Sequence, residues 1–347
     1  MSRVLPLELI VDILSRLPVK SLCRFKCVSK PWRSLISDPD LVKTHLHRAE
    51  SKRLILSSRN SLYSIDHEAP CENGVVAVDL DFPLKQTFQS LHPPWVHIIG
   101  SCNGLVCILP QPDTFFAFNP ATHESVQISA PPTRLLDPNN VHSYGFGYVP
   151  SIDDYKLVKA AQGKPIAVFS LRTGAWKLGE RFNYVRHADY FLSIVPGTLV
   201  NDALHWAFKV PNGSACVVAA FDLVNDKFRD FPVPEPAVLG FSTGVLSGNL
   251  CLMHIDGLRR QYLWVMKEYR VGESWTKVLV VDPFRMVQPL CLWKNSNILM
   301  AKDVRELVLF NRKDGTFKNF KVDGIPDMFF ANLYVESLVS PNFQLHV

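Results

Sequence analysis

The chain has 347 residues, a length that fits two domains of unequal size better than one. Its composition of 47% hydrophobic and 20% charged residues provides for a buried core and argues against a disordered chain. Residues 1–37 hold seven Lys or Arg and two Asp or Glu, so they carry the whole net charge of +5. A neutral remainder argues against nucleic acid as its main partner, and the basic N-terminal part indicates an acidic protein partner.

The first fifty residues are predicted to form helices. Apolar residues recur at helical spacing over residues 5–17, where Pro6 fits the first turn and Pro18 ends the helix. A second helix is expected over residues 19–25 and a third over about 27–37. Asp38 followed by Pro39 is a typical N-cap for a fourth helix that runs to about residue 48.

Such short helices bury little apolar surface by themselves. Two arrangements are compatible with their periodicity. The helices form either a cap on the downstream domain or a docking module whose apolar face is completed by a partner's helices. Composition does not separate the two, but the order of residues favours the docking module.

From residue 5 to residue 36 the chain reads LPLELIVDILSRLPVKSLCRFKCVSKPWRSLI. This run resembles the F-box over the full length of that motif. The resemblance implies docking onto the acidic Skp-family adaptor, which connects an F-box to a cullin, a RING protein and a ubiquitin-conjugating enzyme. It also implies which residues form the docking surface or directly support it: Leu5, Pro6, Leu9, Ile13, Leu14, Leu17, Pro18, Leu22, Val28 and Trp32.

After about residue 52, short apolar runs alternate with Gly, Asn, Asp and Pro, a pattern typical of an all-β domain. One local motif returns: an apolar run ends in an aromatic residue, and a polar turn separates it from another large apolar residue. The leading aromatic residues are 51, 52, 48 and 41 residues apart, at Phe118, Phe169, Phe221, Tyr269 and Phe310. A weaker sixth copy lies near Tyr63. This period, with several short strands in each repeat, predicts a β-propeller.

Tight turns rich in Asn, Asp and Gly form a second repeated feature, at residues 100–105, 199–204, 246–250 and 293–298. Such residues suit the positive φ angles of hairpin turns. The fold is therefore predicted to be mainly β: a helical domain of residues 1–48, followed by a kelch-like, six-bladed propeller of residues 52–347. Residues 334–339 are expected to complete the first blade, and a large β-sandwich is the alternative architecture.

The β region resembles the kelch-type, F-box-associated domain of a large plant F-box family. The resemblance is carried by GSCNGL at 100–105, FNPAT at 118–122, YGFGY at 144–148 with DDYK at 153–156, LHW at 204–206, and MKEY at 266–269 with SW at 274–275. The double glycine of standard kelch repeats is missing, which leaves the number of blades open. Members of the wider family act in pollen self-incompatibility, defence and hormone signalling, and the sequence does not select among these roles.

No pattern in the sequence predicts catalysis, a cofactor or a metal site. Gly145-Phe-Gly147 and residues 100–104 lack the features of a nucleotide-binding loop, so both are interpreted as strand turns. The histidines and the eight scattered cysteines lack zinc-ligand spacing, and the cysteines are expected to be reduced thiols. His45 and His47 are expected at the surface or between domains, and Asp153-Asp154 in a solvated turn. Without a RING of its own, the chain depends on partners for catalysis.

The resulting hypothesis is a non-enzymatic substrate receptor that docks the adaptor through the F-box and an unidentified client protein through propeller loops. Candidate client loops are residues 92–95, 131–140, 181–190 and 257–261. Two alternatives stay open: an adaptor-bound scaffold without ubiquitin transfer, and a ligand-binding propeller with a helical cap. Acidic residues interrupt the first apolar run, and no window holds roughly 18 apolar residues, so a cytoplasmic or nuclear protein without membrane contact is expected.

Overall fold

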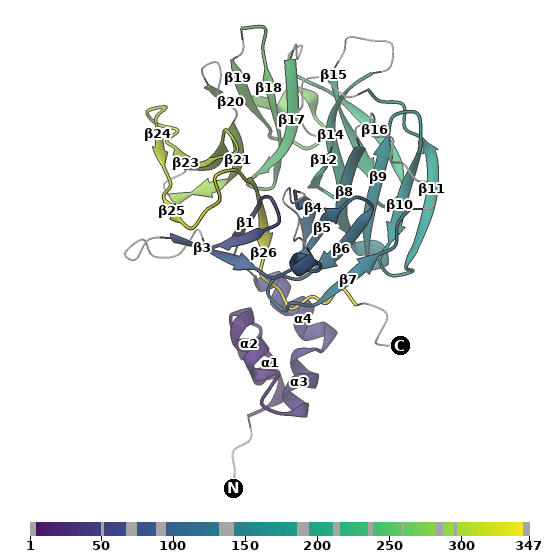
Figure 1. Ribbon diagram of the computed structural model, residues 1–347, viewed down its shortest axis with the longest axis vertical. Coiled ribbons are helices and arrows are strands. Elements are labelled where there is room, and N and C mark those ends of the chain that lie inside the picture. Colours follow the sequence, from purple (N-terminus) through teal and green to yellow (C-terminus); the bar gives the residue numbers. More distant parts are fainter. Residues whose placement is uncertain are drawn as a thin grey trace.

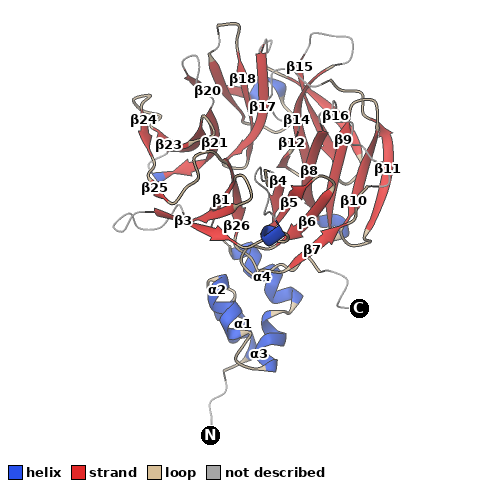
Figure 2. Ribbon diagram, viewed as in Figure 1, coloured by secondary structure: helices blue, strands red, loops and turns tan. Residues whose placement is uncertain are grey.

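The helical domain projects from a ring of β-sheets in the computed structural model (Figure 1). Figure 2 shows that the long helices gather in this N-terminal domain, whereas the ring consists almost wholly of strands. The structure describes residues 5–49, 52–66, 75–87, 95–131, 142–185, 194–210, 216–234, 239–258, 260–281, 287–294 and 297–342.

Four helices form the N-terminal domain: α1 (Leu7–Leu14), α2 (Val19–Phe25), α3 (Lys30–Ile36) and α4 (Pro39–Arg48). The first helix ends three residues earlier than predicted. The third begins three residues later than predicted, because Ser29 caps it: the Ser29 Oγ accepts a hydrogen bond from the Trp32 backbone N–H at 3.4 Å. Asp38 caps α4, as predicted, by accepting two backbone hydrogen bonds in its first turn.

Six separate sheets form the ring, which confirms a six-bladed propeller and excludes the sandwich. From the ring centre outward, blade 1 consists of β26 (Phe330–Val335), β1 (Lys52–Ser57), β2 (Leu62–Ile65), β3 (Val75–Leu80) and β25 (Val322–Asp323). Blade 2 consists of β4 (His97–Cys102), β5 (Leu105–Gln111), β6 (Thr114–Phe118) and β7 (Ser125–Ile128). Blade 3 consists of β12 (Ile194–Pro196), β8 (His142–Val149), β9 (Asp154–Ala161), β10 (Pro165–Ser170) and β11 (Ala175–Arg181).

The remaining blades have four strands each. Blade 4 consists of β13 (Thr198–Val200), β14 (Ala203–Lys209), β15 (Cys216–Asp222) and β16 (Lys227–Pro232). Blade 5 consists of β17 (Leu239–Leu246), β18 (Asn249–Ile255), β19 (Gln261–Met266) and β20 (Trp275–Val281). Blade 6 consists of β21 (Val287–Trp293), β22 (Asn297–Lys302), β23 (Glu306–Phe310) and β24 (Phe317–Asn319).

The last strand of the chain closes the ring beside the first one. The strand β26 pairs antiparallel with β1, from Lys52 opposite Val335 to Ser57 opposite Phe330. The C-terminus therefore completes the first blade as predicted, but the strand covers residues 330–335 and not 334–339. Residues 336–342 lie beyond this strand, so the strand-like sequence of 336–339 does not pair in the ring.

In blades 3, 4 and 6 the repeated aromatic motif is a hairpin formed by the two outer strands. Its two large residues are cross-strand neighbours: Phe169 pairs with Trp176, Phe221 with Phe228 and Phe310 with Phe317, with ring centroids 5.0–5.3 Å apart. Such pairs stabilise a sheet locally, which explains why the motif recurs.

Blade 5 departs from this motif. Here Met266, and not Tyr269, lies opposite Trp275. Tyr269 follows the strand, and its hydroxyl lies 2.9 Å from Nε2 of His205 in blade 4. The tyrosine therefore joins two blades instead of filling one.

Three of the four predicted tight turns have the backbone that their residues predicted, whereas residues 295–296 of the fourth lie outside the described residues. Both central residues have positive φ in the turns at Asn103-Gly104, Asn201-Asp202 and Ser247-Gly248. The interpretation of Gly145-Phe-Gly147 as a turn is wrong, because these residues lie inside β8. A Cβ atom on Gly145 would lie 2.6 Å from a methyl group of Leu204, so close packing of blades 3 and 4 requires glycine there.

Candidate functional site

Large apolar side chains remain exposed on the helical domain. Leu5, Leu7, Leu9 and Ile13, on and just before α1, are 50–60% exposed, and Val28 between α2 and α3 is 68% exposed. Scattered apolar side chains are common on protein surfaces, but several within one small domain indicate a contact surface.

The ten residues predicted for docking fall into two groups. Those exposed at the surface are Leu5, Pro6, Leu9, Ile13, Pro18 and Val28. Leu14 and Leu22 are buried, and Leu17 and Trp32 are half-buried, all within the core of the helical domain. The exposed group is available to a partner, whereas the buried group stabilises the helices on which the exposed residues lie.

Sequence reasoning missed two exposed residues, Leu7 and Phe25. Phe25 ends α2, and its ring packs edge-on against Trp32 with centroids 5.7 Å apart. Phe25 follows Leu22 by three residues, a spacing that places both side chains on one side of a helix, so the sequence held a signal for Phe25. Leu7 begins α1 and is 60% exposed, and no feature of the sequence marked it as a docking residue.

Polar contacts hold α1 against α4. The Arg48 guanidinium donates to Oδ1 of Asp12 at 2.7 Å and also contacts the Ser15 hydroxyl, while Arg16 bonds the same carboxylate. Hydrogen bonds from Arg16 and Arg48 hold the pKa of the Asp12 carboxyl below its usual value. His45, expected at the surface or between domains, is buried inside the helical domain, with Nε2 3.0 Å from the Leu17 carbonyl oxygen. His47 is exposed, as expected.

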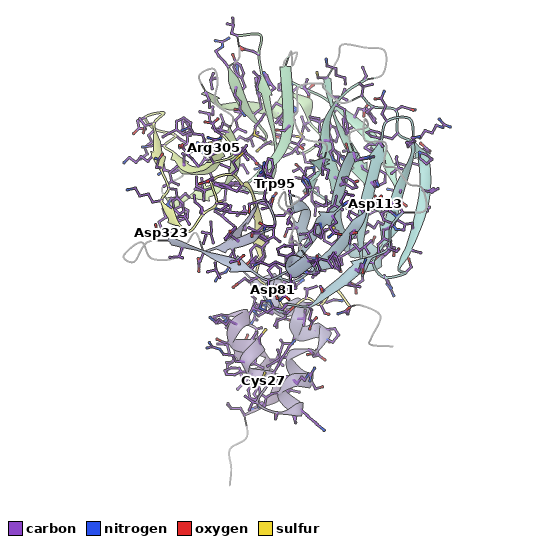
Figure 3. The ribbon with its side chains drawn as sticks, in the orientation of Figure 1. Cys27, Asp81, Trp95, Asp113, Arg305 and Asp323 are labelled. Carbon is purple, nitrogen blue, oxygen red and sulfur yellow. The ribbon has the colours of Figure 1, made fainter. Side chains whose placement is uncertain are left out.

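The cations of the helical domain concentrate on α2 and α3 and in the loop between them. Within the part of the chain that the structure describes, five of them form no ion pair: Lys20, Arg24, Lys26, Lys30 and Arg33. A cleft of about 530 Å³ opens between these helices and blade 2, and its lining comprises Cys23, Lys26, Cys27, Ser29, Lys30, Arg33, Thr122 and Glu124. Exposed Val28 lies in the same loop as the lining residues Lys26 and Cys27, so an exposed apolar side chain adjoins the basic cleft. Figure 3 labels Cys27 on the helical domain.

The helical domain packs on propeller turns from blades 2 and 3. Ala121, in the turn between β6 and β7, contacts the helical core, and Val42 and Leu46 of α4 pack against the core between these blades. Lys43 Nζ pairs with Oδ2 of Asp153 at 3.3 Å.

The Asp153-Asp154 pair is only partly the solvated turn that was expected. Asp153 lies in a left-handed turn, where the hydrogen bond from Tyr148, together with Lys43, holds the pKa of its carboxyl below the usual value. Asp154, in contrast, is buried in β9 and accepts hydrogen bonds from the Ser170 hydroxyl at 2.5 Å and the Arg172 backbone at 2.9 Å. Both acids are therefore structural.

The ring has two faces, which differ in the turns that they hold. Successive strands of a blade alternate in direction. The turn between β6 and β7, which holds Ala121, and the turn between β8 and β9, which holds Asp153, both lie on the face toward the helical domain, as do the corresponding turns of other blades. The strand ends that border the other hairpin turns and the links between blades lie at the opposite face, which we call the far face. The described strand ends that border the predicted client loops lie at the far face, and residues 92–94, 132–140, 186–190 and 259 of these loops lie outside the described residues.

The described ranges hold no cluster of three or more His, Cys, Asp or Glu side chains that could bind a metal ion. They also contain no helix of the length and apolarity needed to cross a membrane.

Comparison with known proteins identifies both parts of the chain. The F-box domain family matches residues 4–44. The F-box/kelch-repeat protein At3g23880 of Arabidopsis thaliana is 30% identical over 97% of this chain and 96% of its own length. The chain belongs to this F-box/kelch-repeat family. F-box protein CPR1 of the same plant is 29% identical over 96% of this chain and 88% of that protein.

The helical domain is thus the F-box, and the ring is its kelch-like propeller. Among solved structures, TolB from Acinetobacter baumannii is similar to this chain with a TM-score of 0.46 and 9% identity, over 85% of this chain and 70% of that one.

Proposed function

We propose that this chain is the substrate-recognition subunit of an SCF-type ubiquitin ligase. The F-box docks onto a Skp-family adaptor, which connects it to a cullin and a RING protein, and the propeller binds a client protein. The observation that carries this proposal is the exposed apolar face of the F-box beside cations without acidic partners. Burial of each half-exposed leucine or isoleucine on docking contributes about 1 kcal/mol, and the cations favour an acidic partner.

The chain itself acts by positioning and is not the enzyme. With the F-box held by the adaptor, the client is bound at the far face of the propeller, where binding loops are free to vary on rigid blades. Its lysines then have a high effective concentration near the thioester of the conjugating enzyme. No disulfide joins any two of the seven described cysteines, which supports action in the reducing cytoplasm or nucleus.

Replacing Leu9 or Val28 by aspartate is expected to lower the affinity for the adaptor by at least about 100-fold, because docking would bury an unpaired charge. Both side chains are exposed, so the F-box should stay folded. Leu17→Asp is less informative, because half-buried Leu17 also packs in the F-box core. The measurement is calorimetric titration of the full-length chain with a purified Skp-family adaptor.

Val78→Asp is the matched control for Val28→Asp. Val78 is 58% exposed, but it lies on β3 of the propeller. It should bind the adaptor like the wild type. Wild-type affinity in both F-box variants would contradict the proposed docking face.

Reversing two charges of the cleft, in the variant Lys26→Glu with Lys30→Glu, is expected to slow association with the adaptor roughly 10-fold at low salt. The difference from the wild type should shrink as ionic strength rises, because salt screens exposed charges. Stopped-flow kinetics at several salt concentrations measures this. A control variant, Lys313→Glu with Lys318→Glu, reverses two exposed charges on blade 6 and should leave the rate unchanged. Equal slowing by both double variants would show a net-charge effect without a defined acidic partner site.

A further inference from the structure

The last described residues run between the propeller and the F-box. After β26 closes the ring, the Ser337 hydroxyl donates a hydrogen bond to the Asn103 carbonyl oxygen at 2.7 Å. The Asn119 side-chain amide donates to the carbonyl oxygens of Ser337 and Val339 at 2.9 and 2.8 Å. Ser337 and Asn119 are completely buried, so water does not compete for these bonds. The segment is therefore built into the helix-side face of the propeller.

Two consecutive side chains of this segment enter two different cores. Leu338, 3% exposed, packs in the F-box core with residues of α1, α2, α3 and α4. Val339, 7% exposed, packs in the core between blades 2 and 3. The residue before them is closely packed as well, since a Cβ atom on Gly104 would lie 2.1 Å from the Ser337 hydroxyl oxygen. One short segment thus joins the two domains by hydrophobic packing on both sides.

We propose that residues 336–340 form a clasp that holds the F-box and the propeller in one fixed orientation. In this proposal, which rests on the receptor function above, Leu338 is a positioning residue for ubiquitin transfer. A receptor speeds ubiquitin transfer by holding client lysines in a narrow range of positions, and free movement between its two domains would widen that range. The strand that closes the ring leads directly into this clasp, so ring closure and domain orientation depend on the same end of the chain.

Leu338→Ala tests the clasp in the full-length chain. It should leave the propeller folded but speed hydrogen exchange at amides of α2 and α4 about 30-fold, since the F-box loses a core side chain. Small-angle scattering of the adaptor complex should show a broader range of domain orientations. Leu338→Met, which keeps most of the apolar volume, should restore both properties. Leu299→Ala removes an equally buried leucine of blade 6 and should not affect exchange in the F-box.

The positioning role has a separate readout in a reconstituted ligase. The measurement is mass spectrometry of which propeller lysines of the receptor itself accept ubiquitin. Wild type and Leu338→Met should share a restricted set of modified lysines, and Leu338→Ala should spread modification to further lysines. Unchanged exchange and scattering in Leu338→Ala would overturn the clasp, and an unchanged lysine pattern alongside faster exchange would overturn the positioning role. If even the wild type transfers no ubiquitin, the proposed receptor function fails, while exchange and scattering still decide whether the clasp exists.

Discussion

A chain that ends after Asn332 is expected to lose the folded propeller. The cut removes Leu333, Tyr334 and Val335 from β26 and so leaves half of β1 as an unpaired inner edge. It also removes buried Tyr334, Leu338 and Val339 from three cores. The losses of Tyr334 and Val339 fall on propeller cores and cost roughly 2–5 kcal/mol each, a large share of the about 5–15 kcal/mol expected for a domain. Soluble yield and the thermal unfolding transition measure the effect.

A chain that ends after Asn342 is the control, because it keeps the closing strand and the clasp. It should express and unfold like the full-length protein. Cooperative unfolding of the shorter chain at the wild-type temperature would show that the C-terminal strand does not close the ring.

Overexpression in the native cell is expected to change client abundance in opposite directions for two forms of the protein. The wild type should lower the abundance of a client, whereas Leu9→Asp combined with Val28→Asp should raise it. The double variant occupies the client but cannot connect it to the ligase, so it protects the client by mass action. Quantitative proteomics of proteins that co-purify with both forms measures this effect.

Point variants are preferable to deletion of residues 1–48 for this experiment. Deletion would expose Leu338 and the propeller surface that Val42 and Leu46 cover, and a misfolded propeller would obscure the result. Val78→Asp is again the matched control and should lower client abundance like the wild type. A change in the same direction for wild type and double variant would contradict the receptor mechanism and favour a scaffold or a ligand-binding propeller.

The sequence by itself determined the features that depend on near neighbours. The F-box was identified from the order of about thirty residues, because helix caps and apolar spacing act within a few turns. The blade count followed from hairpins such as Phe221 and Phe228, whose two members lie only seven residues apart. Left-handed turns such as Asn103-Gly104 were readable for the same reason, since their backbone depends on the residues in the turn itself.

Only the tertiary structure decided which side chains are buried by distant segments. Leu338 belongs to the F-box core although it lies 290 positions after the end of α4, and no local pattern contains that contact. Asp154 looked like a solvated acid, but strand β9 places it in the interior, and Gly145 looked like a turn, but blade 4 packs against it. The division of the F-box residues into an exposed face and a buried support likewise depended on how four helices pack together. Burial is a property of the assembled domain, whereas sequence patterns record the contacts of neighbours along the chain.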